Sequence, residues 1–401
     1  MNNPAKLYIR DSLFETAQIF TAGAALTQTY MSAVGVPDSK IGTAISAMGI
    51  VNIGASVLFS KLSDNSKNIK ASLSALLSIV SLTYLFFTIF SFRLDLTLTV
   101  TFFILIAVGF VQSASVAVRN LFEYKLPYLI FDMDKYARIL TLDGVIAGGT
   151  GVLFSILLNI FISKFEYFTV MRAGFVFAFL LTVLAAGTNQ RFGVKSPEEL
   201  VPRKTGHPVK ISLIVKRRDF AVFAVPNFLR GIAGGVVNMA ALIALSGKLL
   251  DSKGTAFIVT ATTLGNITGS LIYTVLSKRG VEDKTMCLLG SCLMASMVLM
   301  PHFGAAGYIA MFFLANLGIR IVSYSYPLMI YKLIPYEIIG TYNTLRMILT
   351  TAGTAAATWL TGRLLGTVPV WTILTAAFVC QALSAAVYLR RFPKMMAQKN
   401  G

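Results

Sequence analysis

Two arginines, Arg230 and Arg320, lie in the middle of long apolar stretches of the sequence. A run of about 20 apolar residues is long enough to cross the hydrocarbon core of a bilayer as a helix, so both side chains are expected near mid-membrane. A guanidinium group is costly there unless it faces water or a partner, and it therefore marks a functional site by default. Because its planar fork suits carboxylate and phosphate groups, the pair predicts a site for an anionic substrate group.

The alternative for both arginines is a structural ion pair, with Glu15, with Asp143 or with carbonyl groups at a helix C-terminus. Glu15 is the only acid in the first apolar run, and Asp143 is the only one well inside the fifth. A carboxyl group removed from water favours its protonated form and releases the proton when water reaches it. We therefore expect Asp143 or Glu15 to carry a coupling proton, although a local ion pair between Asp143 and Arg138 is equally open.

The elements that hold these residues are apolar runs along almost the whole chain. Of the 401 residues, 56% are hydrophobic and only 13% are charged, which is too apolar for a soluble domain. This pattern predicts an all-α polytopic membrane protein with about twelve transmembrane helices. The expected spans are 12–35, 40–61, 70–92, 96–118, 139–163, 167–188, 219–248, 254–277, 284–302, 305–330, 342–364 and 369–389.

The formal net charge of +18 is unevenly distributed over the loops between these runs. Nearly all basic residues, among them Lys6, Arg10, Arg119 and Arg390, fall at one set of helix ends. The opposite loops carry only Lys40, Arg93, Lys164, Lys248, Lys253 and Arg363. Such asymmetry places the basic side in the cytoplasm, so we expect a bacterial-type inner-membrane protein with both termini cytoplasmic. The charge then reflects topology and anionic lipid rather than nucleic-acid binding.

No pattern in the sequence indicates an enzyme. Cys287, Cys292 and Cys380 sit within apolar spans and imply neither a disulfide framework nor a metal site. No nucleophile–base pair, metal cluster or phosphate-cradling glycine loop stands out. We expect no cofactor.

The chain repeats itself. Residues 38–44 (DSKIGTA) recur as 251–256 (DSKGTA), and residues 124–128 (YKLPY) recur at a similar offset as 331–336 (YKLIPY). Two equal halves in a polytopic chain are typical of secondary transporters, which hold the substrate near mid-membrane between the halves. We expect two pseudo-symmetric six-helix bundles, at residues 1–188 and 219–401. A cytoplasmic linker, 189–218, joins them.

This architecture resembles the major facilitator superfamily over essentially the whole chain. The family's loop signature, Gly-x-Leu-x-Asp-(Arg/Lys)-x-Gly-(Arg/Lys)-(Arg/Lys), corresponds here to residues 60–69 (SKLSDNSKNI). Only Leu62 and Asp64 match well, and both glycines are missing. Helix number, the two halves and the long central loop therefore carry the resemblance, and the motif adds little to it.

The resemblance implies that spans one, four, seven and ten line a central cavity, with the halves rocking to open each side in turn. Each of these spans carries polar residues at helical spacing. Together with Arg230 and Arg320, the expected substrate-binding residues are Gln18, Gln28, Gln112, Asn227, Asn238, Asn316 and Tyr324. The resemblance also implies a cytoplasmic gate formed by Asp64 at the N-terminus of the eleventh span, with Arg346 and Arg138. The alternative is that these three charges serve topology alone.

Together these features predict a secondary active transporter that moves a small polar, anionic solute across the cytoplasmic membrane by alternating access, with a proton as coupling ion. The expected partners are that solute and membrane lipid, and we expect a monomer. The alternatives are a multidrug efflux antiporter and a lipid flippase on the same fold. Against efflux, the fifth span lacks the Gly-Pro pair of the family's drug antiporters, and the fourth span lacks their arginine.

Overall fold

Every regular element in the described part of the chain is a helix. The computed structural model describes residues 2–21, 24–65, 68–91, 97–123, 126, 130–131, 133–193, 218–331 and 339–399. These residues belong to two compact units, Met1–Pro202 with Asp251–Thr260, and Arg203–Leu250 with Ala261–Gly401. The predicted division at 1–188, 189–218 and 219–401 stays a prediction, and residues 194–217 of that linker lie outside the described residues.

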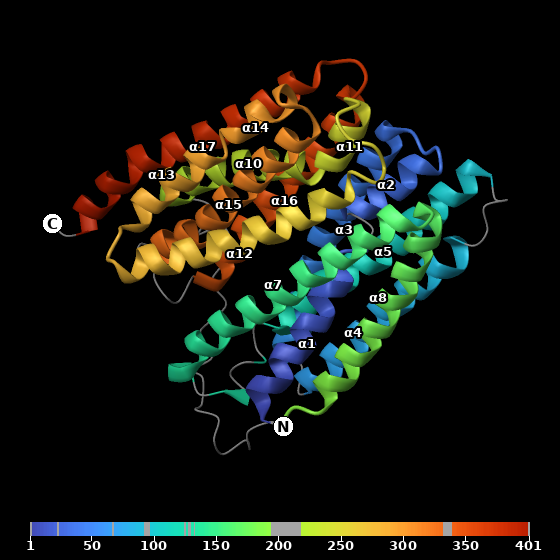
Figure 1. Cartoon of the computed structure of the whole chain (residues 1–401). Coiled ribbons are helices and arrows are strands. Elements are labelled where there is room, and N and C mark those ends of the chain that lie inside the picture. The colour runs from blue at the N-terminus through green and yellow to red at the C-terminus, as the bar shows by residue number, and fades with distance from the viewer. Residues whose placement is uncertain are drawn as a thin grey trace. The chain divides into compact units, whose positions relative to one another are not determined.

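The first unit is built from seven helical segments that occupy the first six expected spans. They are α1 (Asn3–Gln18), α2 (Ala25–Ala33), α3 (Asp38–Asn65), α4 (Ile69–Ser91), α5 (Leu98–Glu123), α7 (Met133–Lys164) and α8 (Tyr167–Gln190). Within the unit, α4 packs on α8 and α5, α3 packs on α5, and α1 packs on both α7 and α8 (Figure 1).

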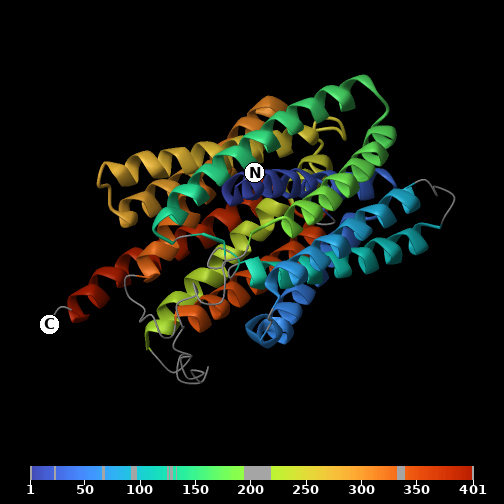
Figure 2. The same ribbon diagram turned by 90° about the horizontal axis from the view of Figure 1, so that it is seen from below.

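The second unit holds the helices of the last six expected spans. They are α10 (Arg218–Asn238), α11 (Ala240–Ser246), α12 (Ala256–Lys278), α13 (Asp283–Leu293), α14 (Ser296–Leu299), η2 (Met300–His302), α15 (Gly304–Tyr331), α16 (Ile339–Leu364) and α17 (Val370–Lys399). The first turns of α12, up to Thr260, group with the first unit. Helix α10 runs beside α16 and α17, and α13 packs on α15 (Figure 2).

Two of the expected spans are broken helices. The first span is divided into α1 and α2, and the hydroxyl of Thr27 donates to the carbonyl of Phe20 at the break, 3.3 Å away. The seventh bends by 52° between α10 and α11, where Tyr308 donates to the carbonyl of Ala240 at 2.8 Å. Breaks at membrane depth are tolerated when side chains bond the backbone groups that the helix no longer pairs.

The helices have the length and apolar character of membrane spans. Among the described residues nine helices pass that test, and the bent pair α10–α11 makes ten. The remaining expected spans, α1–α2 and α16, occur as helices but are more polar. Large apolar side chains face outward, such as Leu58 at 77% exposure, as expected for contact with lipid. The chain is thus an all-α polytopic membrane protein of about twelve transmembrane helices in two pseudo-symmetric bundles.

Glycines let the helices of the second unit approach closely. A methyl group at Gly235 of α10 would lie 2.6 Å from the carbonyl oxygen of Thr354 on α16. One at Gly269 of α12 would lie 2.7 Å from the carbonyl oxygen of Leu317 on α15. Helix pairs in membranes associate through such small residues, because lipid leaves no hydrophobic drive between helices. The contact at Gly269 brings α12 against α15 beside Arg320.

Candidate functional site

Arg320 is held in a fixed orientation by α12 and by its own helix. Its Nε donates to the hydroxyl of Ser270 at 3.1 Å, and its guanidinium carbon lies 4.7 Å from the ring centroid of Tyr324. The Tyr324 ring in turn lies 5.2 Å from that of Tyr273, whose hydroxyl donates to Asp283 at 3.0 Å. The side chain is therefore positioned from two sides.

The guanidinium of Arg320 has unused donors. Within the described part of its own unit, no carboxylate lies within the 4.0 Å of a salt bridge. Among the described residues only Nε has a hydrogen-bond partner, the hydroxyl of Ser270, which leaves the two terminal amino groups for a second partner. A pair of parallel N–H donors at the end of an arginine matches the two oxygens of a carboxylate or phosphate.

Arg230 reaches the same stretch of α15 from α10. Its Nη2 donates to the hydroxyl of Ser323 at 2.7 Å, and Ser323 lies one turn from Arg320. Both arginines are half-buried. The structure therefore brings the two guanidinium groups that the sequence singled out to neighbouring turns of one helix inside the second unit.

The three asparagines predicted to bind the substrate, all in the second unit, differ in their surroundings. Asn227 is buried on α10, at 1% exposure, whereas Asn238 is exposed at the last residue of that helix. Asn316 is 5% exposed and donates to the carbonyl of Phe312, 2.8 Å away on its own helix. This bond uses part of the Asn316 amide inside the α12–α15 contact. The binding role predicted for the three residues stays a prediction.

The three glutamines predicted to bind the substrate, all in the first unit, also differ in their surroundings. Gln112 is 3% exposed and donates to the hydroxyl of Thr83 at 3.2 Å, which ties α5 to α4. Gln28 is fully buried in α2. Gln18, the last residue of α1, is half-buried, and its Nε2 has no partner among the described residues. The binding roles predicted for the three glutamines stay predictions.

Asp143 lies deep in α7, at 7% exposure, and faces the acidic end of α1. Asp11, Glu15 and Arg10, all on α1, lie within electrostatic range of its carboxyl group. Glu15 itself is exposed on α1. The alternative pairing of Asp143 with Arg138 falls on a side chain outside the described part.

Sequence reasoning missed a cluster around Arg10 and assigned that residue to topology. Arg10, at 1% exposure, donates to Asp11 at 2.7 Å and to Asn189 at 3.1 Å, and it also pairs with Glu123. Arg119 lies 3.4 Å from Glu123 and 3.9 Å from Asp11. The spacing of Arg119 and Glu123 by one helical turn was the available signal, but their partners on α1 are remote in sequence.

Of the three predicted gate residues, the structure describes the side chain of Arg346 alone. Asp64 lies in α3 and Arg138 in α7, and both side chains are outside the described part of the chain. Arg346 is half-buried on α16. The gate remains a prediction.

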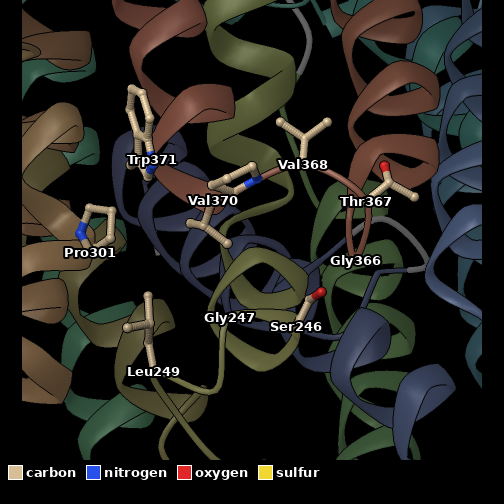
Figure 3. A pocket seen from close by; sticks show the side chains of 10 residues that line it. Ser246, Gly247, Leu249, Pro301, Gly366, Thr367, Val368, Val370 and Trp371 are labelled. Atoms are coloured by element: carbon tan, nitrogen blue, oxygen red, sulfur yellow. The ribbon is translucent and has the colours of Figure 1, made fainter.

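A hollow of about 510 Å³ opens at the ends of α11, η2, α16 and α17 (Figure 3). It is lined by Ser246, Gly247, Leu249, Pro301 and residues 366–371. None of these side chains is charged, and none belongs to the predicted site. The hollow therefore gives no reason to move the anion site away from the arginines.

Comparison with known proteins gives matches in sequence and in fold. The family described as Major Facilitator Superfamily matches residues 12–358. No curated protein sequence matches the chain.

Three solved structures share the fold. A mutant of the nucleoside transporter NupG superposes with a TM-score of 0.71 at 13% identity, covering 98% of this chain and 100% of that one. The E. coli fucose:proton symporter FucP, also a mutant, gives 0.63 at 13% identity over 97% and 98%. A bacterial homologue of the human lysosomal transporter Spinster gives 0.65 at 11% identity over 98% and 96%. At such identities the likeness shows the fold alone.

Proposed function

Since the chain belongs to the major facilitator superfamily, we propose that it is a secondary transporter of a small polar, anionic solute, working by alternating access with a proton as coupling ion. The membership makes it a multi-pass membrane transporter and not an enzyme. The substrate class and the coupling ion are parts of the proposal.

The anionic nature of the substrate is inferred from the groups that surround Arg320. A buried or half-buried guanidinium in a membrane protein is costly unless its charge is matched. Arg320 has hydroxyl and aromatic neighbours but no carboxylate in the described part of its unit. No described residue accepts a hydrogen bond from its terminal amino groups, while Ser270 and the ring of Tyr324 fix its direction. An anionic solute would supply the missing charge, and Arg230 would add a second cation one turn away.

A cationic drug or a neutral sugar fits this arrangement less well. Two guanidinium groups would repel a lipophilic cation, and a neutral solute would supply no charge to Arg320. We therefore prefer transport of an anionic solute to efflux of cationic drugs.

Proton coupling is proposed from one feature of this chain. A fold neighbour is named as a fucose:proton symporter, but 13% identity does not transfer that property. In this chain, Asp143 is a buried carboxyl within electrostatic range of the exposed Glu15, an arrangement suited to proton uptake and release.

We also propose, from the distribution of basic residues, that both termini lie in the cytoplasm and that the protein sits in the cytoplasmic membrane. We propose a monomer as its oligomeric state.

A thermal-shift screen of the purified protein tests the substrate class. Organic anions, sugar phosphates, nucleosides, neutral sugars and lipophilic cations are compared on the wild type and on the Arg320→Gln and Arg230→Gln variants. A ligand at 100 times its Kd stabilises by about 2.7 kcal/mol. A hydrogen bond to a charged group contributes about 1.5–3 kcal/mol, so each variant should weaken anion binding by about ten- to a hundredfold.

Arg363 supplies the matched control. It also stacks on an aromatic ring one turn away, with its guanidinium carbon 4.7 Å from the Trp359 ring centroid, but it is exposed at the last turn of α16. Arg363→Gln should leave anion stabilisation unchanged. Stabilisation by cations or neutral sugars alone, with no change in either arginine variant, would refute the anionic substrate.

A further inference from the structure

The contacts that support Arg320 continue beyond Tyr324. The ring of Tyr324 also contacts the ring of Tyr273 on α12, with 5.2 Å between the centroids and 34° between the planes. The hydroxyl of Tyr273 donates to a carboxylate oxygen of Asp283, 3.0 Å away, at the first residue of α13. A continuous series of contacts therefore runs from the guanidinium through two rings to a carboxylate on a third helix.

The ring of Tyr324 can direct Arg320 only if the ring itself is held in place. A guanidinium over an aromatic ring is a weak contact and does not hold the ring by itself. The hydroxyl of Tyr324 lies 3.4 Å from that of Ser270, which is longer than an O–H···O hydrogen bond usually is. The orientation of the ring must therefore come from its packing, and the aromatic side chain that packs on it is Tyr273.

The position of Tyr273 is itself fixed at both ends of the side chain. It is 9% exposed and belongs to an apolar cluster of α12, α13 and α15, against which Tyr324 packs. A buried phenol needs a partner for its hydroxyl, because an unpaired one loses its hydration without compensation. Asp283 supplies that partner, and since it is only half-buried its own charge can still be hydrated. The carboxylate thus holds the Tyr273 ring at its hydroxyl end.

We propose that Tyr273 and Asp283 are positioning residues of the anion site. Tyr324 acts with them, because it contacts Arg320 and serves the solute through that guanidinium rather than by touching the solute. The inference rests on the proposed anionic substrate and deepens it. Loss of the Asp283 carboxylate leaves the Tyr273 hydroxyl unpaired, which lets both rings turn. Arg320 then keeps Ser270 but loses the second contact that directs its terminal donors.

Labelling with phenylglyoxal, a dicarbonyl reagent that modifies guanidinium groups, tests these roles without any solute. Modification of Arg320 is read by peptide mass spectrometry against the exposed Arg363 in the same digest. Asp283→Ala and Tyr273→Phe should each raise the labelling rate of Arg320 by about three- to tenfold, as expected for one lost hydrogen bond. Asp283→Asn should label as the wild type does, because its amide oxygen still accepts the phenol proton.

Glu282→Gln is the matched control for the labelling experiment. Glu282 is the neighbouring acid, exposed at the N-cap of α13, and its side chain makes no capping hydrogen bond. An unchanged Arg320 rate in Asp283→Ala and Tyr273→Phe would overturn the proposal. An equal rise in Glu282→Gln would also overturn it, because the effect would then follow charge rather than the contact with Tyr273. If Asp283→Ala does not fold, Tyr273→Phe decides, since it keeps the ring.

A double-mutant cycle on the unfolding midpoint, with benzoate as the anion, tests whether Asp283 acts through Arg320. Asp283→Ala should weaken benzoate binding in the wild type and cause no further loss in Arg320→Gln. Additive losses would show that Asp283 has a structural role alone. No stabilisation of the wild type by benzoate or by the other anions, with labelling as expected, would count against the anionic substrate and leave the positioning roles standing.

The role of Tyr324 is tested with cyclohexanecarboxylate, a carboxylate of similar size to benzoate that has no aromatic ring. Tyr324→Leu removes the ring over which Arg320 lies and should weaken the binding of both anions by the same factor. A larger loss for benzoate would show that Tyr324 stacks on the solute, which contradicts its role as a positioning residue.

Discussion

Gly269 is the position where one methyl group tests how Arg320 is held. A Cβ there would lie 2.7 Å from the carbonyl oxygen of Leu317 and 2.9 Å from the Cβ of Arg320. Ordinary contacts begin at 3.4 Å, so in Gly269→Ala the two helices must separate by about 0.7 Å at this point. Neither neighbour is the flexible end of a side chain, so the strain falls on the helix pair.

The effect on stability follows from two opposing terms. Overpacking of a close contact costs about 1–3 kcal/mol. Alanine in place of glycine inside a helix gains about 1 kcal/mol. At Gly234 of α10 nothing lies within 4 Å of an added Cβ, so Gly234→Ala should be stabilised by the helix propensity of alanine without any cost of overpacking. The free energy of unfolding should therefore differ between the two variants by about 1–3 kcal/mol, with Gly269→Ala the less stable.

The effect on binding follows from one hydrogen bond. The distance from Ser270 Oγ to Arg320 Nε is 3.1 Å, and an added 0.7 Å would take it to about 3.8 Å, where it is no longer a hydrogen bond. Arg320 would then lose one of the contacts that direct its terminal donors. Since one lost hydrogen bond to a charged group amounts to about 1.5–3 kcal/mol, anion affinity should fall about tenfold or more.

Both effects are measured on the same samples, as unfolding midpoints with and without the anion found in the screen. The Gly234→Ala variant should bind the anion as the wild type does. Equal midpoints for the two glycine variants would show that α12 and α15 are not in close contact at Gly269. A stable, unaltered anion response in Gly269→Ala would show that Ser270 does not position Arg320.

Two further substitutions test the tertiary contacts of the structure. Tyr308→Phe removes the hydroxyl that bonds the carbonyl of Ala240 at the α10–α11 break, and the loss of this buried hydrogen bond should lower the free energy of unfolding by about 0.5–1.5 kcal/mol. An unchanged unfolding midpoint would mean that this bond does not stabilise the break. Asn189→Ala removes the uncharged partner of Arg10 and should cost about 1.5–3 kcal/mol. Thr188→Ala, at a half-buried neighbour whose hydroxyl bonds only a carbonyl of its own helix, should cost far less. Equal losses at the two positions would contradict the buried role of Asn189.

The sequence by itself determined the class of protein and the number of helices. Apolar runs long enough to span a bilayer leave the backbone no choice but helix, because lipid cannot bond exposed peptide groups. The repeat of residues 38–44 at 251–256 indicated two related halves. Arg230 and Arg320 were identifiable because a charge in an apolar run is conspicuous whatever the neighbouring helices are.

The partners of those charges were decided only by tertiary structure. Ser270 and Ser323 are ordinary hydroxyl residues, and nothing in their local sequence connects them to the two arginines. Gln112 and Asn316 look like cavity residues in sequence, yet they donate to Thr83 and to Phe312 inside the bundles. A helical stripe gives the face of a residue but not the helix that covers it.

The charged cluster around Arg10 shows most clearly that local sequence does not give the partners of a charge. In sequence, Arg10 and Arg119 are two of many basic residues at helix ends, and Asp143 is a single acid whose nearest cation along the chain is Arg138. Packing of α1 against α7 and α8 brings Arg10 to Asn189 and places Asp143 within electrostatic range of Arg10 and Asp11. Charge balance in a buried site depends on which groups meet, and that is fixed by helix packing rather than by any local pattern.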